Sequence, residues 1–179
     1  MKISLLPAAL LAVTISAEAT PQLCFDQAGR DYRIDPLLLM AISIQESRLK
    51  PQATNKSSAG GTQDFCAMQV NSSHFKKLEK FNIARNDLMN DPCICVYTGA
   101  WVLARNFQDY GRNWNSVGIY NAGPSQKNMK ARKEYMGIIK SIYRVLLARK
   151  EIINQQPRLE GDIDNAGKLT DTASLNKVQ

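Results

Sequence analysis

The segment of residues 35–53 constrains the fold more than any other part of the chain. Asp35 followed by Pro36 is typical of a helix start, because aspartate caps the first N–H groups and proline needs no partner at the first helical position. The following turns are apolar on almost every side, which predicts a helix buried in a core. The apolar residues are Leu37, Leu38, Leu39, Met40, Ala41, Ile42 and Ile44. Pro51 follows, so we expect the helix to end near residue 49.

Glu46 lies near the end of this predicted helix. The four-residue steps from Leu38 to Ile42 and on to Glu46 place its carboxyl in line with two aliphatic side chains. Because burial disfavours the charged form, we expect a raised pKa and a carboxyl that keeps its proton near neutral pH, as a general acid requires. The alternative is an ordinary glutamate that is exposed or paired with Arg48.

Three motifs in order along the chain resemble those of one enzyme family. Residues 46–53, which read E-S-x-x-x-P-x-A, resemble the E-S-x-x-x-P-x-A motif of the lytic transglycosylases that cleave peptidoglycan. Residues 67–71, A-M-Q-V-N, are similar to that family's G-L-M-Q-I-N segment, and residues 120–123, Y-N-A-G, match its A-Y-N-A-G motif. The resemblance covers about residues 24–145.

This resemblance implies a mainly α, lysozyme-like fold with a small β-ribbon after the central catalytic helix. It implies Glu46 as the catalytic acid. It also implies that Ser47 orients Glu46 or binds sugar, that Gln69 hydrogen-bonds a sugar, and that Tyr120 and Asn121 line the cleft near the acid. Tyr120 has an alternative place in the core.

Asp64 is the second candidate catalytic carboxylate. Lytic transglycosylases generally use one carboxylate, with the sugar's own 6-hydroxyl closing a 1,6-anhydro ring, whereas lysozymes use two. The stretch 61–71 is also similar to the β-ribbon of c-type lysozymes, whose catalytic aspartate precedes an L-Q-I-N segment. Asp64 is therefore a candidate to stabilise the cationic transition state. The alternative is an aspartate of a glycine-rich turn.

The residues outside the central segment predict further helices and no alternation of strands and helices. The expected elements are helices at 22–32, 92–110, 114–120 and 127–149, a loop at 52–63 and a β-ribbon within 61–71. A second Asp-Pro pair, at residues 91–92, marks the start of the long helix.

The chain length of 179 residues fits one domain with two additional segments. Residues 1–19 have a charged start, a short apolar run and an A-x-A site, which predicts a signal peptide and an exported, periplasmic protein. Residues 20–153 form the predicted transglycosylase domain, and no segment of transmembrane length follows the leader. Residues 154–179 are polar without an apolar face, which predicts a disordered tail.

Four cysteines in an exported chain favour two disulfides. A zinc site using Cys93, Cys95 and His74 is the alternative, but one intervening residue is fewer than zinc sites usually have. Relative to the transglycosylase pattern, Cys66 replaces a glycine and Cys95 an asparagine. A bridge between these two departures explains both, which leaves Cys24 to pair with Cys93. No cofactor or metal is expected.

Positive charge is concentrated in one half of the chain. Residues 101–150 hold ten basic and two acidic side chains, against ten and nine in residues 1–100. Such a patch fits an anionic polymer such as the cell wall, or an ordinary solvated helix face. Nucleic acid is not expected as a partner, because no recognition motif accompanies the charge.

The sequence therefore predicts an exported lytic transglycosylase that cleaves the MurNAc–GlcNAc bond of peptidoglycan. By resemblance, it is of the small kind associated with secretion, conjugation or pilus machines that span the envelope. One alternative is a hydrolytic muramidase that uses Glu46 and Asp64. The other is a non-catalytic assembly factor that binds glycan, with a cleft reshaped by Cys66 and Cys95.

Overall fold

A computed structural model describes residues 23–56 and 61–175, with side chains through residue 154. The predicted signal peptide lies outside these residues. In chain order the elements are α1 (Phe25–Tyr32), α2 (Pro36–Ser47), β1 (Thr54–Lys56), β2 (Gln63–Phe65), β3 (Val70–Asn71), η1 (Ser72–His74), α3 (Phe75–Leu78), η2 (Glu79–Phe81), α4 (Arg85–Asn90), α5 (Pro92–Tyr110), α6 (Trp114–Ala122), η3 (Gln126–Asn128) and α7 (Met129–Leu175). The mainly α class with a small sheet after the central helix is confirmed.

Helix α2 is the buried helix that the sequence predicts. Asp35 caps it, accepting a hydrogen bond of 2.9 Å from the Leu37 amide. Leu39 and Ile42 are fully buried, and the helix packs against α1, α5 and α7. It ends where Arg48 adopts a left-handed backbone conformation, which closes its last turn.

Helix α5 begins at the second Asp-Pro pair, as predicted. The Asp91 carboxylate accepts hydrogen bonds from the amides of Cys93 (2.7 Å) and Ile94 (3.1 Å). Further along the helix, a Cβ added to Gly99 would lie 2.7 Å from the Met68 side chain. The absence of a side chain at Gly99 therefore lets α5 lie directly against the segment that follows β2.

The small sheet has three antiparallel strands in the order β1-β2-β3. Its first strand lies in the stretch 52–63, which the sequence analysis predicted to be a loop, and that prediction was wrong for β1. The three residues of β1 are all polar and all exposed, so the sequence there shows no alternation of apolar and polar residues that would indicate a strand. The register places Asp64 in the middle strand, opposite Asn55 on one side and Asn71 on the other.

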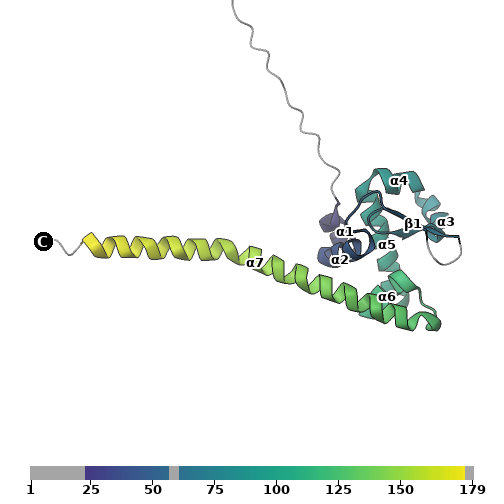
Figure 1. Cartoon of the computed structure of the whole chain (residues 1–179). Helices are drawn as coiled ribbons and strands as arrows, with labels where there is room; N and C mark the ends of the chain where they lie inside the picture. Colours follow the sequence, from purple (N-terminus) through teal and green to yellow (C-terminus); the bar gives the residue numbers. More distant parts are fainter. Residues whose placement is uncertain (1–22, 57–60, 176–179) are drawn as a thin grey trace, which may run out of the picture.

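Helix α7 starts beside α6 and α2 and then leads away from the domain (Figure 1). Its backbone continues to Leu175, so the stretch 154–175, which the sequence analysis predicted to be disordered, is helical in the structure. Absence of an apolar face argues against packing and does not by itself exclude a local helix. The boundary between domain and tail at residue 154 stays a prediction.

Both disulfides predicted from the sequence are formed, one between Cys24 and Cys93 and one between Cys66 and Cys95. The second is fully buried and links the turn after β2 to α5. Cys66 has a φ of 63°, a left-handed conformation that suits glycine and costs other residues about 1 kcal/mol. The position at which the family pattern has glycine therefore keeps a backbone suited to glycine, although this chain carries cysteine there.

This backbone predicts a difference between two variants that both lack the inner bridge. Without the 29-residue closure, Cys66→Ala/Cys95→Ala is expected to lose about 3 kcal/mol of unfolding free energy. Cys66→Gly/Cys95→Ala is expected to lose less, by up to about 1 kcal/mol, because glycine adopts the left-handed conformation without strain. Urea unfolding under non-reducing conditions measures both. A more stable alanine variant would show that the turn does not keep this conformation.

Candidate active site

A cleft of about 690 Å³ lies between the sheet and the helices α2, α5, α6 and α7. All three segments of the predicted motifs contribute to its walls, together with residues that the sequence analysis did not single out. Its lining is Glu46, Lys56, Asp64, Gln69, Val70, Asn71, Ser73, His74, Val102, Asn106, Ile119, Tyr120, Asn121, Ala122, Gly123, Pro124, Asn128 and Ala131. The cleft therefore collects the candidate acid, the second carboxylate and several polar side chains suited to sugar hydroxyls.

Glu46 occupies the next-to-last position of α2, on the wall of this cleft. Burial raises the pKa of its carboxyl to about 7, and the nearby negative charge of Asp64 adds to the increase. A hydrogen bond from the Tyr135 hydroxyl, 2.5 Å from Oε1, acts in the opposite direction by stabilising the carboxylate. The raised pKa predicted from the apolar helix is confirmed, and pairing with Arg48 is not what the structure shows.

Tyr135 is the residue next to Glu46 that the sequence analysis missed. It lies on α7, is 5% exposed, and burial raises the pKa of its hydroxyl well above the usual value. The hydroxyl therefore stays protonated and donates to Glu46. A signal was available, because Tyr135, Ile139 and Ile142 share the core face of a predicted helix. A tyrosine on a buried face usually needs a hydrogen-bond partner.

Asp64 faces the same cleft from β2, so it belongs to a strand and not to a turn. Its Oδ1 accepts a hydrogen bond of 2.7 Å from Asn71, its neighbour on β3. Asn71 also donates to the Thr62 hydroxyl at 3.2 Å. The sheet thus fixes the orientation of the second carboxylate in the cleft that Glu46 also lines.

Gln69 lines the cleft, but its amide is bonded within the protein. Its Oε1 accepts from Asn55 at 2.7 Å, and its Nε2 donates to the carbonyl oxygens of Cys66 at 2.8 Å and Ala53 at 3.3 Å. It has a φ of 48° and is 8% exposed. In this structure Gln69 stabilises the turn between β2 and β3, and its predicted contact with sugar stays a prediction.

Ser47 is not among the described residues that line the cleft. Its hydroxyl lies 2.8 Å from the Ala67 carbonyl, which also accepts from the buried Ser43 hydroxyl at 3.1 Å. Two serines one turn apart on α2 therefore hold the turn that contains Cys66. Ser47 acts on the site by fixing this turn, one position along the chain from Glu46.

The third motif contributes Tyr120 and Asn121 to the cleft, as predicted. The Tyr120 hydroxyl donates to the Met68 carbonyl at 2.8 Å, which joins α6 to the turn after β2. Burial raises the pKa of Tyr120 well above its usual value, so the hydroxyl stays a donor. Asn121 is exposed and lies in the cleft wall.

His74, which the sequence analysis considered only as a possible zinc ligand, also lines the cleft. It is half-buried, and its ring meets Trp101 edge to face with centroids 6.0 Å apart. Burial lowers the pKa of His74, and the charges of Lys77 and Arg105 lower it further. The imidazole is therefore neutral at pH 7 and offers one donor and one acceptor at this end of the cleft.

Among the residues that the structure describes, no group of three or more His, Cys, Asp or Glu side chains is arranged to hold a metal ion. Within the same residues, no helix combines the length and hydropathy needed to cross a membrane.

Comparison with known proteins places the chain in a family. Residues 23–142 match the family model described as "Transglycosylase SLT domain". The X polypeptide of Escherichia coli is 40% identical over 154 residues, which cover 85% of this chain and 89% of that protein. Invasion protein IagB of Salmonella typhimurium is 43% identical over 123 residues, covering 69% and 76%. Protein IpgF of Shigella flexneri is 38% identical over 112 residues, covering 63% and 73%.

The family match spans more than half of the chain and includes Glu46, Asp64 and the third motif. The helical fold with its small sheet agrees with a lysozyme-like domain of this family. The chain therefore belongs to the transglycosylase SLT family and is a peptidoglycan lytic transglycosylase.

Proposed function

We propose that this protein is exported and cleaves the β-1,4 bond between MurNAc and GlcNAc, with Glu46 as general acid and then base, leaving 1,6-anhydro-MurNAc ends. The observation that carries the proposal is the position of Glu46. It is a carboxyl on the cleft wall whose pKa burial raises to about 7, so a large fraction keeps its proton at neutral pH. This is the protonation state that departure of a sugar oxygen requires.

The proposed reaction needs one carboxyl that works twice. In the first step Glu46 gives its proton to the glycosidic oxygen, the C1–O bond breaks, and positive charge develops at C1 of MurNAc. In the second step the Glu46 carboxylate takes the proton of the 6-hydroxyl while that oxygen bonds to C1 and closes the anhydro ring. The carboxyl is then protonated again, and no water is consumed.

The groups around Glu46 fit both steps. The Tyr135 hydroxyl, 2.5 Å from Oε1, stabilises the carboxylate that exists between the two proton transfers. The carboxylate of Asp64, held by Asn71 on the opposite side of the cleft, supplies negative charge toward the developing cation. Neutral His74 and exposed Asn121 offer hydrogen bonds to sugar hydroxyls farther along the cleft.

The hydrolytic muramidase is the second candidate function, and the observation that favours it is Asp64. Its negative charge lies near enough to Glu46 to raise the pKa of that carboxyl, as in a site with two catalytic carboxylates. The two alternatives differ in what attacks C1. An anhydro end marks attack by the 6-hydroxyl, and a reducing end marks attack by water.

The hypothesis of a non-catalytic assembly factor required that Cys66 and Cys95 reshape the cleft. In the structure Cys66 is fully buried, is bonded to Cys95, and is not among the described residues that line the cleft. Its bridge links the turn after β2 to α5. This arrangement supports an enzyme with an open cleft.

Export and a role in an envelope-spanning machine complete the proposal. Two disulfides support a location outside the reducing cytoplasm. The relative named "Invasion protein IagB" supports a role in invasion. In this proposal the enzyme opens the cell wall locally for such a machine. Peptidoglycan glycan strands are the substrate in this proposal.

Glu46→Gln is expected to reduce release of soluble peptidoglycan fragments by about 10³-fold, because the amide cannot donate and recover a proton. Turbidity loss of purified peptidoglycan measures the rate. The raised pKa means that the folded state keeps a proton that the unfolded chain releases, so the parent loses stability between pH 4.5 and about 7. The variant is therefore expected to melt at the same or a higher temperature than the parent at pH 8. Parental activity in this variant would exclude Glu46 from the mechanism.

Tyr135→Phe is expected to move the alkaline limb of the pH–activity profile to higher pH. The parent should lose activity above pH 7 as Glu46 deprotonates, and loss of the Tyr135 hydrogen bond raises the pKa of Glu46 further. Tyr143→Phe is the matched control, because it removes a bond of the same length to Asp35 at the other end of α2. An alkaline limb that is identical in parent and Tyr135→Phe would contradict the assignment.

Asp64→Asn is expected to slow cleavage by about tenfold while anhydro ends remain the product. The asparagine keeps an oxygen that accepts from Asn71, so the sheet is retained. Removing the negative charge also lowers the pKa of Glu46, which moves the alkaline limb to lower pH. Mass spectrometry of the digest reads the ends. Reducing ends from the parent, with activity lost in Asp64→Asn, would favour the muramidase.

A further inference from the structure

Helix α7 carries a second apolar stripe on the face turned away from the core. The core side of the helix is formed by Tyr135 and Ile139, which are 5% and 0% exposed. On the other side Ile138, Val145 and Ile152 are 43%, 68% and 61% exposed. These three follow one another at seven-residue intervals, which is close to two full turns, so they form one line along the helix.

The residues between them complete the pattern of a helix-pairing surface. Ser141 and Ala148 are exposed and lie three residues after Ile138 and Val145, where a heptad has its second seam position. The Ser141 hydroxyl donates to the Gly137 carbonyl at 3.1 Å, which satisfies it within the helix. Branched residues alternate here with small ones, which lets another helix approach closely. We call the five residues 138, 141, 145, 148 and 152 the outer seam.

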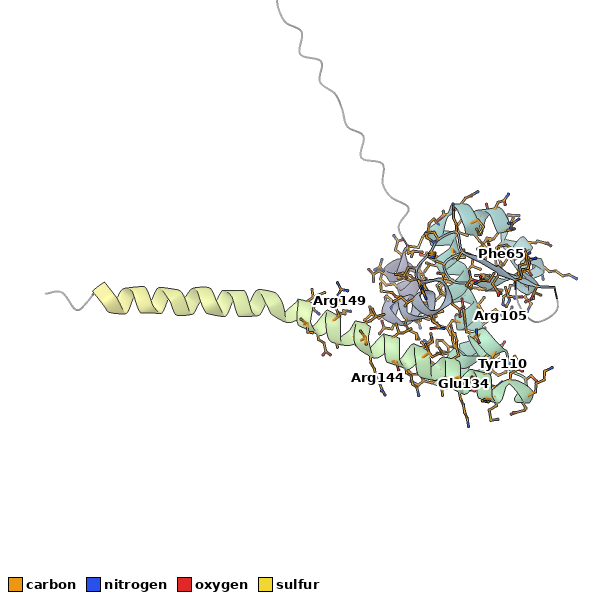
Figure 2. The ribbon with its side chains drawn as sticks, in the orientation of Figure 1. Phe65, Arg105, Tyr110, Glu134, Arg144 and Arg149 are labelled. Atoms are coloured by element: carbon orange, nitrogen blue, oxygen red, sulfur yellow. A yellow bond between two sulfur atoms is a disulfide. The ribbon has the colours of Figure 1, made fainter. Side chains whose placement is uncertain are left out.

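Positive charge flanks the outer seam on both sides. Arg144 and Arg149 are exposed and occupy the positions beside the seam where heptads carry the charges that select a partner. Figure 2 shows both arginines on the part of α7 that leads away from the domain. Lys133 and Lys150 are also exposed nearby. The acidic residues of this stretch are Glu134 and Glu151.

We propose that the outer seam of α7 docks an acidic amphipathic helix of a protein partner. The seven-residue spacing selects a helix, because a narrow seam suits coiled-coil packing, whereas helices that lie on membranes have a wider apolar face. The flanking arginines select acidic side chains on that helix. A second copy in a parallel pair is disfavoured, because that pairing sets Arg144 against Arg149 of the other helix and each chain carries a net charge of +7.

The docking surface is separate from the active site. The cleft touches α7 at Ala131, and Val145 lies 14 residues further along, about 20 Å at the rise of an α-helix. Binding to the outer seam therefore leaves the cleft open, and binding and cleavage can be measured independently.

The test uses the oxidised full-length chain without its leader and a labelled synthetic peptide of three heptads, with leucine at both seam positions and glutamate at the flanks. Fluorescence anisotropy at 0.15 M salt is expected to show saturable binding. Val145→Ser should weaken it at least tenfold, and Arg144→Glu at least fivefold. Lys150→Glu, an equal change of charge off the seam, should change it less than twofold. A peptide of the same composition with its heptads scrambled should not bind.

Three outcomes would overturn the proposal. The first is equal binding of the acidic peptide by the parent and by Val145→Ser. The second is a dimer in sedimentation experiments that Val145→Ser abolishes, which would assign the seam to a second copy. The third is Val145-dependent binding to vesicles of phosphatidylglycerol and phosphatidylethanolamine without binding to the peptide. Peptidoglycan cleavage is expected at the parental rate in Val145→Ser, so a failure here is distinguishable from a failure of the proposed catalytic function.

Discussion

The burial of one carboxyl at the end of α2 is the constraint on which the active site depends. Glu46 keeps a pKa of about 7 because it is buried at the end of α2, a helix that packs against α1, α5 and α7. The same helices hold the donor: Tyr135 comes from α7, which packs along α2. A single packing arrangement therefore sets both the protonation of the acid and the stabilisation of its conjugate base.

The turn between β2 and β3 is the second support of the site, and it shows how a sequence can depart from its family while keeping a backbone. Cys66 and Gln69 are both left-handed, and such a turn is costly unless its surroundings hold it. Here the holding contacts come from the Cys66–Cys95 bridge, the Gln69 amide and the two serines of α2. The glycine of the family pattern removes the strain, whereas this chain keeps the strain and adds a covalent bond.

The central features of the fold and of the site were predictable because their signals are local. Two Asp-Pro pairs fixed the starts of α2 and α5, and the apolar turns of α2 indicated the buried carboxyl. Strand β1 was not predictable from its own sequence, because its three exposed residues form a strand only by pairing with β2. Tyr135 reaches Glu46, and His74 reaches the cleft, through packing of distant segments, which no pattern within either segment encodes. The hydrogen bond from Ser47 to Ala67 was not predictable, since Ala67 comes from a different element, and the predicted role of Ser47 toward Glu46 or sugar stays a prediction.

The two faces of α7 serve the active site and the proposed docking surface. Its inner face supplies Tyr135 to the acid and closes the core, so rotation of the helix about its axis would withdraw that hydroxyl from Glu46. A partner must therefore accept α7 in its present orientation, which presents Val145 and its neighbours outward. Because the helix is continuous from the cleft to the outer seam, a partner bound there fixes the direction in which the cleft faces. If the enzyme opens the wall at one place, as in the proposed function, it gains from such a rigid connection, since a flexible tether of the same length would leave the cleft free to turn.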